Sequence, residues 1–425
     1  MTTASQSGKV RALLARMQQY ALFVCVLTLP IQGQALLPGT DLTLTKVAGG
    51  LLVLAVILDR AMQLRFPLPA IGIESATILA LAAAAASIPN SVARDESIRA
   101  LYIFVQYAAI CYASAYVCSQ RDGLVAYLPP LLVASSAASG IGATLARLGA
   151  GVTPTVNTII PGSNIPRITF GLPDANEQAM ILAIALAFAM FAPQLWTTRA
   201  RATLALLALC AIGAGLLLTM SRTGWICAVL LCMLRIALHP KRMQLASATI
   251  LAVVIAGLAL MLLRPGITES VQRRIMETTG QGDKSIASRV AYTVEVVEAA
   301  RKGGATGHGF GTAFTVAQQF SDPLGNRIGT TVHNVPLMVW LETGWLGAAA
   351  FLWLWASVLG VLVFALRSAE TPGLRAQLAP YLIIALVYGV FSLVMPFLQR
   401  SCLPILLGCA LGLALAALPR VKAQS

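Results

Sequence analysis

Long runs of apolar residues, separated by shorter polar stretches, occupy most of this chain. Each run holds about 20 residues, which as a helix can cross the roughly 30 Å of hydrocarbon in a bilayer. The pattern predicts about twelve spans, placed approximately at residues 17–37, 43–62, 68–88, 98–118, 123–147, 176–195, 202–220, 223–238, 243–263, 333–366, 376–397 and 400–418. It therefore predicts an all-α, polytopic membrane protein in which residues 1–425 form a single integral membrane domain.

The connections between the spans set a direction in the membrane, because Lys and Arg concentrate in short cytoplasmic loops. If the N-terminus is cytoplasmic, the inside connections and the C-terminus carry Arg60, Arg65, Arg121, Arg199, Arg201, Arg235, Lys241, Arg242, Arg367, Arg375, Arg420 and Lys422. Both termini are therefore expected inside, and two long loops, at about 148–175 and 264–332, outside. The tenth span is too long for one crossing, so its start, Asn334 to Gly347, is expected to lie along the outer surface.

The large loop at 264–332 is expected to be periplasmic and partly helical. Ser285 can cap a helix and Gly303-Gly304 can end it. Between them, apolar residues recur at spacings of four, four and three, at Ile286, Val290, Val294 and Val297. Eight of the chain's 30 Lys and Arg residues also lie in this loop. A long, charged, glycine-punctuated loop has little other use in such a chain, so we expect it to cover an active site.

The composition agrees with a membrane protein and excludes a soluble domain, because 58% of the residues are hydrophobic and 11% are charged. In a membrane protein, the formal charge of +14 indicates orientation bias and anionic lipid or phosphate ligands rather than nucleic acid. The eight cysteines lie in predicted spans without metal-ligand spacing, which indicates buried free thiols. Lys9, Arg11 and Arg16 precede an apolar segment without a cleavage site, so this segment is expected to stay as the first anchor.

His333 is the first candidate for chemistry. It stands where the large loop re-enters the tenth span, and a histidine can accept a proton near neutral pH. The same position also suits an interfacial histidine that only caps a helix, and position alone does not decide between the two. His308 is expected to be a solvated turn residue, and His239 a structural residue on the cytoplasmic side.

Two arginines could hold a phosphate. Arg222 lies in the tight junction Ser221-Arg222-Thr223-Gly224 between two apolar helices, and Arg289 lies on the predicted loop helix. Guanidinium groups stay charged and can grip phosphate oxygens with two hydrogen bonds, so together the two suit a diphosphate. Snorkelling of Arg222 to the membrane surface and a solvated helix face for Arg289 are the simpler alternatives.

Weaker candidates lie in the two outer loops. Gly307 and Gly309, in the Gly307–Gly311 stretch, could bring backbone N–H groups to a phosphate, although a plain glycine turn is commoner. Asp174 and Glu177 match a helix capping box, which leaves Asn176 able to bind a ligand. Arg167 is a further possible phosphate contact. Acidic residues on the outer side are too sparse for a metal cluster, so a metal-free mechanism without a cofactor is expected.

In this order, these positions resemble the O-antigen ligase and polymerase superfamily of bacterial envelope membrane proteins. The likeness covers roughly residues 160–350 in detail and rests on Arg167, Gly171, Pro173 to Asn176, Ser221 to Gly224, Arg289, Gly307 to Gly311, His333-Asn334 and Glu342 to Gly347. No single element is specific, but their order around one large loop is. The rest of the chain matches only in topology.

The resemblance implies an inner-membrane enzyme whose active site faces the periplasm. Its donor would be a polysaccharide on undecaprenyl diphosphate, and in the ligases the acceptor is the sugar core of lipid A. The family's catalytic histidine and arginines correspond to His333, Arg222 and Arg289, and Asn334, next to His333, is expected to contact the substrate. Chain length and the single large outer loop favour a ligase. An O-antigen polymerase, an enzyme that transfers glycan to protein serines, and a lipid-linked glycan transporter remain the alternatives.

Overall fold

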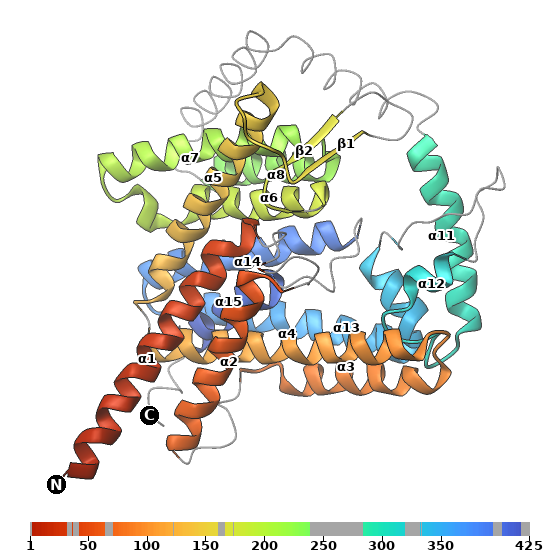
Figure 1. The fold of residues 1–425 in the computed structure, drawn as a ribbon, viewed down its shortest axis with the longest axis horizontal. Coiled ribbons are helices and arrows are strands. Elements are labelled where there is room, and N and C mark those ends of the chain that lie inside the picture. The colour runs from red at the N-terminus through yellow and green to blue at the C-terminus, as the bar shows by residue number, and fades with distance from the viewer. Residues whose placement is uncertain are drawn as a thin grey trace. The chain divides into compact units, whose positions relative to one another are not determined.

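The computed structural model describes residues 2–31, 36, 42–63, 71–121, 123–159, 166–172, 174–238, 284–318, 332, 334–393 and 402–417. The main helices among them are α1 (Thr2–Thr28), α2 (Leu44–Met62), α3 (Glu74–Ser87), α4 (Arg94–Gln120), α5 (Leu128–Leu148), α6 (Ala175–Phe191), α7 (Arg199–Leu218), α8 (Arg222–Leu238), α11 (Lys284–Lys302), α12 (Ala313–Ala317), α13 (Val335–Ser368), α14 (Pro372–Ser392) and α15 (Cys402–Ala417). The short 3₁₀ helices η1 (Leu29–Ile31), η2 (Ile88–Asn90), η3 (Val125–Tyr127) and η4 (Pro193–Trp196) lie in connections. The fold is therefore α-helical, as predicted (Figure 1).

Six helices in the described part of the chain are long and apolar enough to cross a membrane, which confirms a multi-pass membrane protein. These candidate spans are Gly8–Ile31, Arg94–Gln120, Val125–Leu148, Arg199–Leu218, Val335–Ser368 and Pro372–Ser392. Each predicted span that falls on described residues coincides with a helix, and the one predicted at 243–263 lies outside them. The count of twelve spans and the outward side of the large loop stay predictions.

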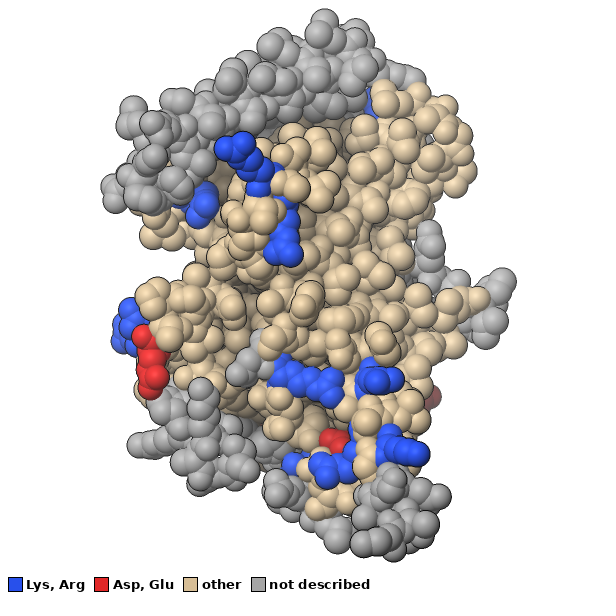
Figure 2. All heavy atoms as spheres, turned by 90° about the vertical axis from the view of Figure 1, so that its left-hand side faces the viewer, with Lys and Arg blue, Asp and Glu red and all other residues tan. Residues whose placement is uncertain are grey.

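The exposed side chains also indicate a membrane protein. Many leucine, isoleucine and aromatic side chains on the helices are exposed, which suits contact with lipid. On the face that Figure 2 shows, charged side chains leave wide areas uncovered, and most of those present are basic.

Two compact units make up the chain: the first combines Met1–Val26, Leu44–Val125 and Lys284–Ser425, and the second combines Leu27–Thr43 and Ala126–Asp283. In the first unit α15 packs along α4, where a Cβ on Gly408 or Gly412 would overlap the backbone of α4. Small residues allow this close approach of two apolar helices. That residues 1–425 act as one membrane domain stays a prediction.

In the second unit, α6 is surrounded by α5, α7 and α8, and almost every one of its residues is buried. Before α6 lies a two-stranded antiparallel hairpin, β1 (Val156–Ile159) and β2 (Pro166–Thr169), in which Thr158 pairs with Arg167. The sequence did not predict these strands, because four-residue segments in a polar loop carry too little alternation to be recognised. The hairpin matters because it places Arg167 beside α6 and α7.

Candidate functional site

Arg167 ties three elements of the second unit together. Its Nε donates to the backbone carbonyl of Thr219 at 3.0 Å, and its Nη2 donates to Oδ1 of Asn176 at 2.8 Å. Strand β2 supplies the arginine, the first turn of α6 supplies Asn176, and the end of α7 supplies the carbonyl. From the sequence, Arg167 and Asn176 were each predicted to contact a ligand. In the structure the two side chains are hydrogen-bonded to each other.

The start of α6 is fixed by Asp174. Its Oδ1 accepts hydrogen bonds from the backbone N–H groups of Asn176 at 2.8 Å and Glu177 at 2.9 Å. This geometry confirms the N-cap predicted from the sequence and explains Asp174 without a catalytic role. It also orients the first turn of the helix, which holds the Asn176 side chain toward Arg167.

The junction between α7 and α8 places Arg222. Met220 in this junction has a φ of 51°, the only positive value among the described non-glycine residues, and a conformation that costs free energy. A Cβ on Gly224 would lie 2.9 Å from the Cβ of Ala179, so only glycine lets α8 begin this close to α6. Half-buried Arg222 is therefore the first residue of α8, beside the backbone that Arg167 holds.

Arg222 sits where the local field favours an anion. The N–H groups of the first helical turn lack partners within the helix, and the helix dipole places partial positive charge at this end. A guanidinium group added to that field suits a phosphate. The junction and its arginine were predicted from the sequence, whereas the positive φ of Met220 was not.

In the first unit, the Gly307–Gly311 turn is locked onto α13. The N–H of His308 donates to the carbonyl of Leu341 at 3.0 Å, and the N–H of Gly309 donates to that of Glu342 at 2.8 Å. In return, the N–H of Trp345 donates to the carbonyl of Gly304 at 3.3 Å. We call this set of bonds, between residues 304–309 and 341–346, the clasp. Gly307 and Gly309 were predicted to present their N–H groups to a phosphate. In the structure the N–H of Gly309 belongs to the clasp, and the N–H of Gly307 donates to the carbonyl of Gly303 at 2.9 Å.

The clasp depends on a break in α13 at Gly344, whose φ of 67° and ψ of −170° interrupt the helix. Only glycine readily adopts this conformation. A Cβ at Gly344 would overlap the backbone of Ala305, and one at Gly307 would overlap that of Gly344. The break lies within the start of this long segment, and the expected position of that start along the outer surface stays a prediction.

Glu342 is buried inside the clasp, with 1% of its surface exposed. Its Oε1 accepts a hydrogen bond from the N–H of Ala313, the first residue of α12, at 3.0 Å. Its Oε2 has no hydrogen-bond partner among the described residues. The carboxyl group therefore joins α12 to α13, a contact that sequence reasoning missed, although a carboxylate within an apolar helix was a signal.

His333 lies outside the described residues, whereas its chain neighbours Val332 and Asn334 lie within them. Next to it, Asn334 caps α13, accepting at Oδ1 from the N–H of Leu337 at 2.9 Å, and its Nδ2 donates to the carbonyl of Leu393 at 3.2 Å. The sequence proposed Asn334 as a substrate contact. Its observed bonds make it a cap that fixes where the helix after His333 begins.

Arg289 lies on α11, which confirms the helix predicted in the large loop and its end before Gly303. The helix begins at Lys284, so Ser285 lies inside it rather than at the predicted cap position. Val296 and Ala300 of this helix are fully buried against a cluster that includes Met338 and Leu341 of α13. Position 289 lies two turns before Val296 on the same helical row. The side chain of Arg289 is outside the described part, so its role stays a prediction.

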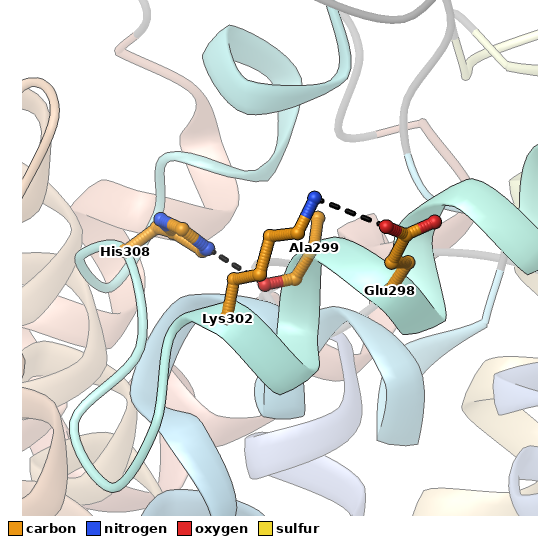
Figure 3. Close-up of polar contacts among 4 residues, drawn as sticks. All are labelled: Glu298, Ala299, Lys302 and His308. Carbon is orange, nitrogen blue, oxygen red and sulfur yellow. Dashed lines mark hydrogen bonds and ion pairs between the residues drawn. The ribbon is translucent and has the colours of Figure 1, made fainter.

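His308 is half-buried, not the solvated turn residue that the sequence indicated. Its Nε2 lies 2.9 Å from the carbonyl oxygen of Ala299 on α11 (Figure 3). Folding of the turn onto the end of α11 buries it. His239 lies outside the described residues. Within the described part of the chain, no three His, Cys, Asp or Glu side chains are grouped to hold a metal, and the expected metal-free, cofactor-free chemistry stays a prediction.

A family model described as O-Antigen ligase matches residues 206–352. This segment contains Arg222, Arg289, the Gly307–Gly311 turn and His333, whereas Arg167 and Asn176 lie before it. No curated protein matches the chain.

Proposed function

Because the chain belongs to the O-antigen ligase and polymerase superfamily, we propose that it is a ligase, a glycosyltransferase of the bacterial inner membrane. It transfers O-antigen polysaccharide from undecaprenyl diphosphate to the sugar core of lipid A on the periplasmic side, with both termini in the cytoplasm. The observation that carries this proposal is the match over residues 206–352, which contains the candidate base and both candidate phosphate-binding arginines.

The chemistry needs no further activation, because the diphosphate is already a leaving group. His333 takes the proton from an acceptor hydroxyl, whose oxygen attacks the anomeric carbon of the donor sugar. The new carbon–oxygen bond forms as the bond to the diphosphate breaks, which inverts the anomeric centre. A general base typically contributes about 10²–10⁴-fold to the rate.

Arg222 and Arg289 bind the diphosphate and stabilise the negative charge that grows on it as it leaves. Fixed cations at a developing charge lower the barrier because they need no reorganisation during the reaction. Holding two lipid-bound substrates together also removes much of the entropic cost of their encounter. The mechanism requires His333, Arg222 and Arg289 to face one periplasmic cavity.

The weaker candidates enter this proposal mainly as positioning residues. Arg167 and Asn176 support the junction that presents Arg222, since one bond of Arg167 ends on Thr219. Asn334 caps the start of α13, next to His333. Gly309 donates to Glu342 farther along that helix, and Gly307 packs against the break at Gly344. Their observed bonds support this role more strongly than direct phosphate binding.

Reconstituted transfer tests the function. Purified full-length chain is incubated with undecaprenyl-diphosphate-linked glycan and, in separate reactions, with lipid A–core, a second donor glycan or a serine-containing protein. The ligase proposal predicts product with lipid A–core only. Product with the second glycan would identify a polymerase, product on protein a protein glycosyltransferase, and movement of donor across vesicles without product a transporter.

A further inference from the structure

A cavity of about 330 Å³ lies in the first unit, outside the residues to which the reaction is assigned. It is bounded by α11, α12, the turn at His308 and the segment before α4, and its described lining residues are Val92, Glu295, Glu298, Ala299, Lys302, His308 and Val316. Small-molecule sites in proteins usually range from about 300 to 1,000 Å³. This cavity is therefore large enough for a ligand of one or two rings.

The charged lining is acidic in a chain that is otherwise basic. Glu295, Glu298 and Lys302 lie on one side of α11, and the Lys302 ammonium is 3.0 Å from a Glu298 oxygen (Figure 3). Two carboxylates and one ammonium give the described lining a formal charge of −1, against +14 for the whole chain. A phosphate is disfavoured here by like-charge repulsion, whereas hydroxyl and amino donors are attracted.

Glu295 supplies an acceptor that no group in the described part of the chain uses. Its Oε2 is shielded from solvent and has no hydrogen-bond partner among the described residues. A shielded carboxylate oxygen without a partner is costly, because its lost hydration is not replaced. A hydroxyl or ammonium group of a ligand in the cavity would restore the missing bond.

His308 adds a second acceptor. The carbonyl of Ala299 can only accept, so the bond at 2.9 Å requires Nε2 of His308 to carry the proton. In the neutral imidazole the lone pair then lies on Nδ1, which can accept from a sugar hydroxyl. Figure 3 shows the ring reaching toward α11 with its other nitrogen turned away from Ala299.

The walls of the cavity are held in place from several sides. The N–H of Val92 donates to the carbonyl of His308 at 3.0 Å, and Nδ2 of Asn90 donates to Oγ1 of Thr306 at 2.8 Å. The clasp fixes the same turn to α13. Acceptors in a preformed frame bind a ligand at a lower entropic cost than mobile ones.

We propose that this cavity binds one sugar unit of a glycan substrate, a unit that presents free hydroxyl or amino groups and carries no phosphate. Glu295 and His308 accept its hydrogen bonds, Lys302 donates, and Val92 and Val316 contact its apolar ring face. The proposal rests on the proposed glycosyl transfer and deepens it, because it separates recognition of the glycan from binding of the diphosphate. The unit belongs to either the donor or the acceptor glycan, which present the same chemistry.

A binding measurement tests whether the cavity holds a sugar, independently of catalysis. Saturation-transfer NMR is measured on the purified full-length chain in detergent with glucose, glucosamine, N-acetylglucosamine and glucose 6-phosphate. Signals from the phosphate-free sugars are expected, with weaker ones from glucose 6-phosphate. Glu295→Gln removes the charged acceptor, and Val92→Trp narrows the cavity at an exposed residue, so each variant should lower the signals at least about fivefold. Glu370→Gln, an exposed acid away from the cavity, is the matched control.

Steady-state transfer identifies the source of the sugar. In Glu295→Gln, KM for one glycan substrate should rise about tenfold, the effect of losing one charge-assisted hydrogen bond, while kcat is retained. A rise for the donor or for the acceptor assigns the subsite to that glycan. Equal sugar signals in wild type, Glu295→Gln and Val92→Trp, or unchanged KM for both substrates, would overturn the proposal. If the wild-type chain transfers no glycan at all, the proposed ligase function is wrong. The NMR signals then still test whether the cavity binds a sugar.

Discussion

Arg167 donates from Nη2 to Oδ1 of Asn176 at 2.8 Å, and this bond joins the hairpin to the first turn of α6. A second bond from the same guanidinium reaches the carbonyl of Thr219, three residues before Arg222. One arginine therefore connects the hairpin, the start of α6 and the end of α7. Its planar fork holds two acceptors in a fixed geometry, whereas the donors of a lysine all lie on one freely rotating ammonium group.

Arg167→Lys should destabilise the chain by about 1–3 kcal/mol, because a partly buried, charge-assisted pair of hydrogen bonds is lost. It should also lower kcat, since the junction that presents Arg222 loses its support. Thermal unfolding in detergent and transfer rates measure both effects. The control is Arg201→Lys on α7, whose guanidinium bonds Thr197 at an exposed site and should change little. Equal behaviour of the two variants would contradict a positioning role for Arg167.

Gly344→Ala should destabilise the chain by at least about 1–3 kcal/mol, because a side chain is strained at this backbone conformation and would also overlap Ala305. The clasp should open, and transfer should fall with it. Gly360→Ala on the same helix is the matched control, since a Cβ there meets nothing within 4 Å. That substitution should be neutral or slightly stabilising. A Gly344→Ala protein as stable as Gly360→Ala would show that the clasp does not hold α13.

Substitutions of Glu342 distinguish a structural role of its side chain from a role in the reaction. Glu342→Gln keeps an oxygen that can accept from the N–H of Ala313, so stability and kcat should stay within about twofold of wild type. Glu342→Ala leaves that buried N–H without a partner and should cost about 1–3 kcal/mol. Thermal unfolding and transfer assays separate the outcomes. A well-folded Glu342→Gln protein without activity would mean that the carboxyl group takes part in the reaction.

Much of this architecture could be predicted from the sequence because hydrophobic length alone identifies membrane helices. The Asp174 cap and the loop helix ending at Gly303 were also readable, since both depend on neighbouring residues. The partners of Arg167 and the Gly307–Gly311 turn were not readable. Their bonds go to Asn176, Thr219, Leu341 and Glu342, and no local pattern reports such distant contacts.

Removal of divalent metal should leave transfer unchanged within about twofold, because arginines, rather than a cation, neutralise the diphosphate in this mechanism. Purified chain is treated with EDTA, desalted and assayed with and without added Mg²⁺. Loss of activity that Mg²⁺ restores would show that a cation shares the work assigned to Arg222 and Arg289.

The most direct test of the mechanism is the transfer rate of His333→Ala in the reconstituted reaction, with folding checked by thermal unfolding. The proposed general base predicts a fall in kcat of about 10²–10⁴-fold with folding retained. His239→Ala, which replaces a histidine predicted on the cytoplasmic side, should stay within about twofold of wild type. Near-normal transfer by a folded His333→Ala protein would contradict the assignment of the base, and with it the mechanism.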